Sequence, residues 1–171
     1  MVTQTPDHLI PGPATQVQHR LGIPATSFAL DLNAGCAGYV QGLATISSLQ
    51  SAARTPYALL LVGDTITRHI GPEDQATRPI FSDAGSATLL RFAGYPHSMH
   101  FSLASDGANS QAIYLPNRSA RASDIDTKTH QMAGLEVFEF ALTRVVPQLE
   151  QMMDRIELDP NTAIRPVRPF L

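Results

Sequence analysis

Cysteine, lysine and long apolar runs are scarce in this chain of 171 residues. It holds one cysteine, Cys36, and one lysine, Lys128. A single cysteine excludes an internal disulfide and is compatible with a reducing compartment. The arginines are scattered and the formal net charge is −3, so the chain has no basic footprint of the kind that binds nucleic acid. We therefore expect no nucleic-acid partner.

Signals for export and for membrane insertion are also missing. The N-terminus has no basic flank followed by an apolar run, so the sequence predicts no signal peptide. No stretch approaches the roughly 20 apolar residues that span a bilayer. Apolar residues make up 43% and charged residues 16%, as is ordinary for globular proteins. These properties predict a soluble, cytoplasmic protein that is long enough to bury a substantial core.

Segments that fit strands alternate with segments that fit helices. The run at 57–62 is continuously apolar and lies between Pro56 and Gly63, which is typical of a strand covered on both faces. The segment 36–53 is apolar on most faces and predicts a buried central helix. The other predicted elements are a helix at 14–21 and strands at 2–5, 27–32, 86–92 and 99–105. This alternation predicts an α/β fold with a largely parallel sheet.

The later part of the chain has a different pattern. A polar, turn-rich excursion at 106–129 precedes a segment with helical spacing at 132–156. Pro147 should kink that helix or start a new turn, because proline lacks the N–H group that a helix interior needs. Prolines crowd the last residues and argue against a strand there. We divide the chain into a first half at residues 1–95, which carries Cys36, and the start of a second half at residues 96–171.

Cys36 lies in a turn flanked by two glycines, between a predicted strand and a predicted helix. A helix N-terminus has unpaired N–H groups and a partial positive charge, which stabilise a thiolate. Gly35 and Gly38 would leave room for a substrate to approach the sulfur. The arrangement is the thiol counterpart of the strand-turn-helix elbow that presents serine in hydrolases. From the residues alone, Cys36 is either a nucleophile or a buried residue that fills space.

Four segments together resemble the ketoacyl-acyl-carrier-protein synthase III family of thiolase-like condensing enzymes. They are Asp31–Tyr39, Tyr57–Asp64, Thr77–Ala87 and Met132–Phe138, and they occur in the family's order at similar spacing. The first resembles the family's nucleophile segment and the last its Met-x-Gly-x-Glu-Val-Phe helix start. The resemblance implies a partial thiolase-like fold, with a mainly parallel sheet and a buried central helix that carries the nucleophile at its N-terminus.

The resemblance implies an acyltransferase of the condensing type. Cys36 would take an acyl group from acyl-CoA as a thioester and condense it with malonyl-acyl carrier protein, with loss of carbon dioxide. The backbone N–H of Cys36 would contribute to an oxyanion hole. No tightly bound cofactor is implied, because the coenzyme A thioester is a substrate. The implied partners are acyl-CoA, acyl carrier protein and a second copy of the chain in a homodimer.

The resemblance also assigns residues to substrate binding. Ile80 and Phe81 match positions that wall the acyl pocket near the thiol. Ile10 matches a loop position that reaches into the acyl pocket of the partner subunit. Three later residues match positions that line the pantetheine channel: Met132, Gly134 and Phe138. Taken without the resemblance, apolar residues at such spacings are core residues.

The chain also departs from the family's pattern. The catalytic histidine and asparagine of the family lie beyond Leu171, and the family's first strand-helix-strand portion lies before Met1. The chain therefore resembles a central fragment of a condensing enzyme. Gln75 stands where the family often has an arginine for the coenzyme A adenine, and the family's Phe-Gly-Asp-Gly appears as residues 81–84, Phe-Ser-Asp-Ala.

Other functions stay open at this point. The missing histidine and asparagine favour a non-catalytic thiolase-like fragment, or a structural partner subunit without independent activity. A cofactor-binding α/β module lacks its Gly-rich or Gly-Lys-Ser/Thr motif, and thioester hydrolysis would need a base that the sequence does not identify. His97 and His100 lack a third ligand nearby, so we expect no metal site. His130, just before the Met-Ala-Gly motif, is a hypothesis for acid–base work at the channel mouth.

Overall fold

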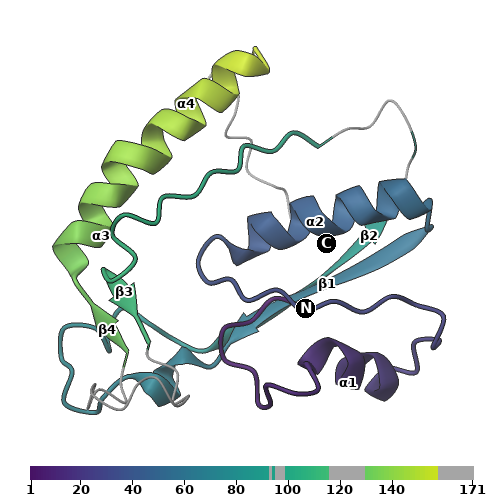
Figure 1. Ribbon diagram of the computed structural model, residues 1–171, viewed down its shortest axis with the longest axis horizontal. Helices are drawn as coiled ribbons and strands as arrows, with labels where there is room; N and C mark the ends of the chain where they lie inside the picture. Colours follow the sequence, from purple (N-terminus) through teal and green to yellow (C-terminus); the bar gives the residue numbers. More distant parts are fainter. Residues whose placement is uncertain (93, 95–98, 116–129, 158–171) are drawn as a thin grey trace, which may run out of the picture. The chain divides into compact units, whose positions relative to one another are not determined.

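The structure is a computed structural model that describes residues 1–92, 94, 99–115 and 130–157 (Figure 1). These residues fall into two compact units. The first unit contains the described residues up to 94 together with His130, and the second contains residues 99–115 and 131–157. The predicted boundary after residue 95 lies outside the described residues and stays a prediction.

An antiparallel pair of strands forms the sheet of the first unit. β1 (Tyr57–Asp64) pairs with β2 (Ala84–Arg91) along its full length, with Leu59 opposite Leu89. The connection between them holds only a short 3-10 helix, η1 (Ile66–His69), among irregular turns. Parallel neighbours are usually joined through a crossover α-helix, and this connection contains none, in keeping with the antiparallel pairing.

Parallel pairing occurs on the other side of β1. Val2 forms parallel bridges with Val62 and with Leu32. The predicted α/β class is confirmed, and the sheet is mixed, with parallel bridges at Val2 and an antiparallel ladder between β1 and β2. The predicted strand at 27–32 is wrong except for Leu32, since Phe28 is 77% exposed and lies in no strand. Among the described residues, Leu32 pairs with only the short segment around Val2, and no longer ladder forms there.

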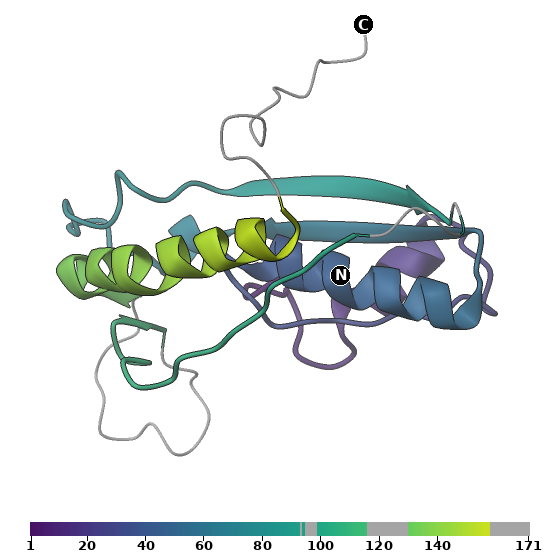
Figure 2. The ribbon, with the colours of Figure 1, turned by 90° about the horizontal axis from the view of Figure 1, so that it is seen from above.

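The predicted central helix is α2 (Gly38–Ala53), which packs along β1 (Figures 1 and 2). Its buried positions are Gly38, Gly42, Ala44 and Gln50. Leu60, in the middle of β1, is 4% exposed and contributes to the same core. Tyr39, Val40 and Leu49 on α2 are exposed, so the expectation of a helix buried on most faces is wrong. The described residues cover only the side of α2 that faces β1.

The predicted short helix is confirmed as α1 (Pro13–Arg20), one residue earlier than expected. Proline suits the first helical position because its fixed φ fits the helix and its missing N–H is not needed there. The carboxylate of Asp31 accepts hydrogen bonds from the Ala14 N–H, at 3.0 Å to Oδ1 and 3.2 Å to Oδ2. Asp31 therefore caps α1 from the segment that leads toward Cys36.

The carboxylate of Asp64 anchors the N-terminal segment to the end of β1. Its Oδ1 accepts hydrogen bonds from the hydroxyl of Thr3 (2.9 Å), the N–H of Gln4 (2.7 Å) and both the N–H (3.1 Å) and the hydroxyl (3.0 Å) of Thr5. Thr3 and Thr5 are buried. Because one charged oxygen satisfies several donors, it fixes the path of residues 3–5.

The second unit contains a two-stranded pair and a long helical segment. β3 (Ile113–Tyr114) pairs antiparallel with β4 (Gln131–Met132). α3 (Gly134–Phe140), the π-helical turn η2 (Ala141–Val145) and α4 (Val146–Arg155) then follow without a break. The wide turn comes directly before Pro147 and accommodates a residue that cannot donate to a regular helix, so the predicted disturbance is confirmed.

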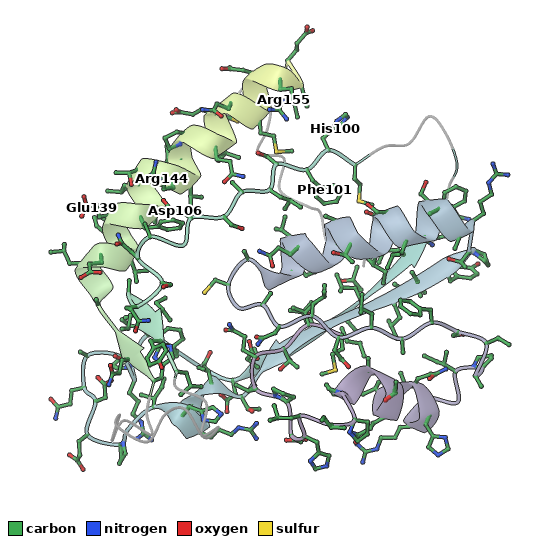
Figure 3. The ribbon with its side chains drawn as sticks, viewed as in Figure 1. His100, Phe101, Asp106, Glu139, Arg144 and Arg155 are labelled. Carbon is green, nitrogen blue, oxygen red and sulfur yellow. The ribbon has the colours of Figure 1, made fainter. Side chains whose placement is uncertain are left out.

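Residues 99–107 run along this helical segment as an irregular chain (Figure 3). Gln148 donates from Nε2 to the carbonyl of Ser102 (2.9 Å) and to its hydroxyl (3.1 Å). Arg144 and Asp106 form an ion pair at 3.1 Å. The strand predicted at 99–105 is wrong, since no second strand pairs with this segment among the described residues. In the part of the chain that the structure describes, no helix combines the length and apolar character needed to cross a membrane.

The Asp64 anchor yields the first prediction. Asp64→Ala leaves buried threonine hydroxyls and backbone N–H groups without their acceptor, so we expect the free energy of unfolding to fall by about 3 kcal/mol. Urea denaturation measures this change. Asp64→Asn keeps one acceptor oxygen and should cost about 1 kcal/mol. Equal losses of unfolding free energy in Asp64→Ala and Asp64→Asn would contradict this prediction, because the side-chain oxygen that Asn retains would then add no stability.

Candidate active site

Cys36 is an exposed free thiol in the turn that leads into α2. A hydrogen bond of 2.7 Å from the Gly38 N–H to the Gly35 carbonyl closes this turn. Ala37 is the N-cap residue of the helix, so Cys36 immediately precedes it. The sequence predicted this position correctly, and the thiol is open to solvent rather than packed as filler. Its role as a nucleophile stays a prediction.

Free N–H groups gather at the start of α2. No side chain caps this helix end. The N–H of Cys36 forms no hydrogen bond with another described residue. Such N–H groups carry the partial positive charge of a helix N-terminus. The turn can therefore stabilise negative charge on the sulfur, or on an oxygen of a group bound to it.

Gly35 and Gly38 serve close packing. A Cβ atom at Gly38 would lie 2.7 Å from Cγ1 of Val2. At Gly35 it would overlap the side-chain amide of Gln4. The expectation that these glycines leave room for a substrate is therefore wrong, because the space beside them holds the N-terminal segment. Their effect is to bring the cysteine turn against residues 2–4.

Ile80 and Phe81 lie just before β2, in a segment held by Asp83. Thr67 donates its N–H to Oδ1 of Asp83 (2.9 Å) and its hydroxyl to Oδ2 (2.8 Å). These hydrogen bonds lower the pKa of Asp83, because they stabilise the carboxylate. Ile80 is 65% exposed and Phe81 is partly buried, so this segment presents apolar surface to solvent. The role of both residues as a wall of an acyl pocket stays a prediction.

A second carboxylate, that of Asp74, shapes the turn before Ile80 and Phe81. Oδ1 of Asp74 accepts the N–H groups of Thr77 (2.8 Å) and Ala76 (3.1 Å). Hydrogen bonds from Thr77, followed by the one from Ala76, lower the pKa of Asp74. The N–H of Ile80 in turn donates to the Thr77 carbonyl at 3.0 Å. The position of Ile80 therefore depends on a turn organised by one anion.

His130 packs against Phe81 inside the first unit. The two ring centroids are 5.1 Å apart and the rings are inclined by 64°, an edge-to-face contact. The His130 N–H donates to the carbonyl of His69 at 2.8 Å. Burial lowers the pKa of His130, the Asp74 carboxylate opposes this shift, and His69 adds to it. The imidazole is buried, which contradicts the predicted position at a channel mouth.

The three residues matched to the pantetheine channel lie in β4 and α3 of the second unit. Met132 is in β4, and its Cε is 3.8 Å from where a Cβ of Gly134 would lie. Phe138 follows Gly134 by about one helical turn, so both lie on one side of α3. The side chain of Phe138 is exposed. Ile10 lies in the loop before α1 of the first unit and is 90% exposed. The binding roles of all these residues stay predictions.

A metal site finds no support in the described ranges, where no three metal-binding side chains come together. His97, one half of the histidine pair weighed from the sequence, lies outside these ranges.

Two carboxylates that hold the segment of Ile80 and Phe81, Asp74 and Asp83, were not predicted from the sequence. Asp74 had a local signal, because Asp followed three residues later by Thr is typical of a capped turn. The pairing of Thr67 with Asp83 joins positions 16 apart in sequence and has no local signature. The contact of His130 with Phe81 joins residues still farther apart in the sequence, so it could not be predicted from a local pattern either.

Comparison with known proteins identifies relatives along most of the chain. Residues 30–107 match the family described as 3-oxoacyl-[acyl-carrier-protein (ACP)] synthase III. The beta-ketoacyl-[acyl-carrier-protein] synthase III of Pectobacterium atrosepticum is 33% identical over 161 residues, which cover 94% of this chain and 50% of that protein. The Pseudomonas aeruginosa protein of the same name is 34% identical over 91% of this chain and 48% of its own length. The chain thus spans about half the length of these curated relatives.

Solved structures agree with the sequence matches. The crystal structure of 3-oxoacyl-(acyl carrier protein) synthase III from Pseudomonas aeruginosa is 32% identical with a TM-score of 0.82, covering 92% of this chain and 49% of that one. The Thermus thermophilus enzyme gives a TM-score of 0.82 at 29% identity, over 94% and 50%. The chain therefore has a thiolase-like α/β fold and is similar to 3-oxoacyl-[acyl-carrier-protein] synthases III along about half of their length.

Proposed function

We propose that this chain is the nucleophile-bearing part of a condensing acyltransferase that acts in fatty-acid biosynthesis. Cys36 takes an acyl group from acyl-CoA, and the acyl group is then condensed with malonyl-acyl carrier protein. The observation that carries this proposal is the exposed thiol at the uncapped start of α2. The names of the relatives, beta-ketoacyl-[acyl-carrier-protein] synthase III, support the reaction class.

The first step is a thioester exchange. The Cys36 thiol gives its proton to solvent, and the thiolate attacks the carbonyl carbon of acyl-CoA. The resulting oxyanion accepts a hydrogen bond from the free N–H of Cys36. The carbon–sulfur bond to coenzyme A then breaks, and the coenzyme A thiolate leaves and takes up a proton. Ile80 and Phe81 wall the acyl pocket, and Ile10 serves the pocket of a partner subunit.

The second step requires groups beyond Cys36. Loss of carbon dioxide from malonyl-acyl carrier protein generates the carbanion that attacks the Cys36 thioester. The family resemblance assigns this step to a histidine and an asparagine, which lie outside the four segments that carry the resemblance. Met132, Gly134 and Phe138 line the channel for the pantetheine arm that both substrates carry. We therefore assign acylation to residues 1–95 and channel binding to the start of a second half at residues 96–171.

A second candidate function is that of a structural partner subunit without activity of its own. It is favoured by the apolar side chains that the described residues leave exposed on α2, including Tyr39, Val40 and Leu49. Such a face fits a role in which another part of the family fold covers it. Acylation of Cys36 distinguishes the two candidates.

Coenzyme A enters this proposal as a substrate and not as a resident cofactor. We place the reaction in the cytoplasm, where reducing conditions keep the Cys36 thiol free.

The acylation proposal predicts a single adduct. Incubation with acetyl-CoA should add one acyl group at Cys36, as intact and peptide mass spectrometry would show, and Cys36→Ser should abolish it. The matched control moves the thiol along the same helix, to the exposed position Ser48, in the double variant Cys36→Ser/Ser48→Cys. Because position 48 lacks the free N–H groups of the helix start, we expect acylation there to be at least about tenfold slower. Equal rates would contradict the proposal.

We also propose that the chain forms a homodimer through the segment that precedes Cys36. Phe28 and Leu30 expose apolar side chains there, although they lie close in sequence to the site. Apolar residues exposed next to a functional segment are typical of protein interfaces.

Phe28→Asp should therefore weaken the dimer by about 2 kcal/mol, or roughly thirtyfold in its dissociation constant, because it places a charge in an apolar contact. Sedimentation velocity over a concentration series measures this effect. Leu89→Asp changes an equally exposed apolar residue on β2 and should leave the dimer intact. A monomer at all concentrations in the unmodified chain would refute the proposed interface.

A further inference from the structure

A buried imidazole lies directly behind the proposed wall of the acyl pocket. His130 is 6% exposed. Its ring meets Phe81 at a centroid distance of 5.1 Å and an inclination of 64°. Its backbone N–H donates to the carbonyl of His69, at the end of η1, at 2.8 Å. The backbone of His130 is therefore bonded to the connection between β1 and β2, and its ring contacts the ring of Phe81.

One nitrogen of the His130 imidazole makes no hydrogen bond to the described residues. This atom, Nδ1, is buried. Buried polar atoms in proteins are nearly always paired, because leaving one unpaired costs free energy. What the ring does provide is an aromatic surface against Phe81. An imidazole kept at this cost points to a role in shaping the wall.

We propose that His130 is a positioning residue that sets the orientation of Phe81, and thereby the depth of the acyl pocket and the length of acyl group accepted at Cys36. The proposal rests on the proposed function only in taking Phe81 as a wall of that pocket. Phe81 is partly buried, so its ring can turn into any space that a smaller residue at position 130 would open.

Burial favours the neutral imidazole at this contact. The charged or titratable groups that act on His130 from the described residues are Asp74 and His69, both in the connection between β1 and β2. Burial outweighs the attraction of Asp74, and the pKa of His130 is lowered. The unfolded chain thus binds the proton more readily, so acid below about pH 6.5 opposes the packed state. Protonation should therefore loosen Phe81.

The first test observes Phe81 directly and does not depend on Cys36 chemistry. The full chain is labelled with 4-fluorophenylalanine, and the Phe81 signal is assigned in the ¹⁹F spectrum by its loss in Phe81→Leu. We expect this signal to move between pH 8 and pH 5 in the unmodified chain and to stay fixed in His130→Phe. The matched control is His19→Phe, which replaces an exposed histidine on α1 and should keep the titration.

The second test measures selectivity. Acylation of Cys36 by hexanoyl-CoA and by acetyl-CoA is compared in the unmodified chain, His130→Ala, His130→Phe and His19→Ala. The hexanoyl-to-acetyl rate ratio should rise about tenfold in His130→Ala, and return toward the original in His130→Phe, which refills the space. His19→Ala should leave the ratio unchanged.

The two tests separate the failure of each proposal. If the unmodified chain is not acylated at all, the proposed function fails, and the ¹⁹F titration still decides whether His130 positions Phe81. A Phe81 signal that ignores both pH and His130→Phe overturns the inference. An unchanged rate ratio in a folded His130→Ala overturns it as well. Should His130→Ala unfold, the volume-filling His130→Phe in the ¹⁹F experiment decides.

Discussion

The burial of Val2 is the constraint on which the candidate site depends. Val2 is the largest fully buried side chain of the described residues, and it bridges Leu32 on one side and Val62 on the other. Its side chain occupies the space that a Cβ of Gly38 would need. One residue thus joins the segment before Cys36, the first turn of α2 and the end of β1. Without this packing the cysteine turn would have no fixed position relative to the sheet.

Features with a local cause could be predicted from the sequence. The turn at Cys36, the strand β1 and the disturbance near Pro147 each follow from a few neighbouring residues: a glycine pair, an apolar run between breakers, and a ring without an N–H group. These features place the thiol at the start of α2. They are also the features that carry the resemblance to the condensing enzymes.

Features that depend on a distant partner could not be predicted. The segments 27–32 and 99–105 have the apolar character of strands, yet a strand exists only where a second one offers its backbone groups. In the part of the chain that the structure describes, Leu32 pairs with only the short segment around Val2, and Ser102 bonds to the side chain of Gln148 instead. The same limit hid the contact of His130 with Phe81, because no local pattern marks it.

Carboxylates hold several segments of the site in place, since few apolar side chains are buried beneath it in the described residues. Asp64 holds the N-terminal segment, Asp83 and Asp74 hold the segment before β2, and each acts by accepting backbone N–H groups. The lowered pKa values of Asp74 and Asp83 mean that their stabilisation is present above about pH 4 and is lost as acid protonates them. His130 responds to acid at a higher pH than these carboxylates, and in the same direction. Falling pH should therefore disturb the contact of His130 with Phe81 before it releases the hydrogen bonds that Asp74 and Asp83 accept.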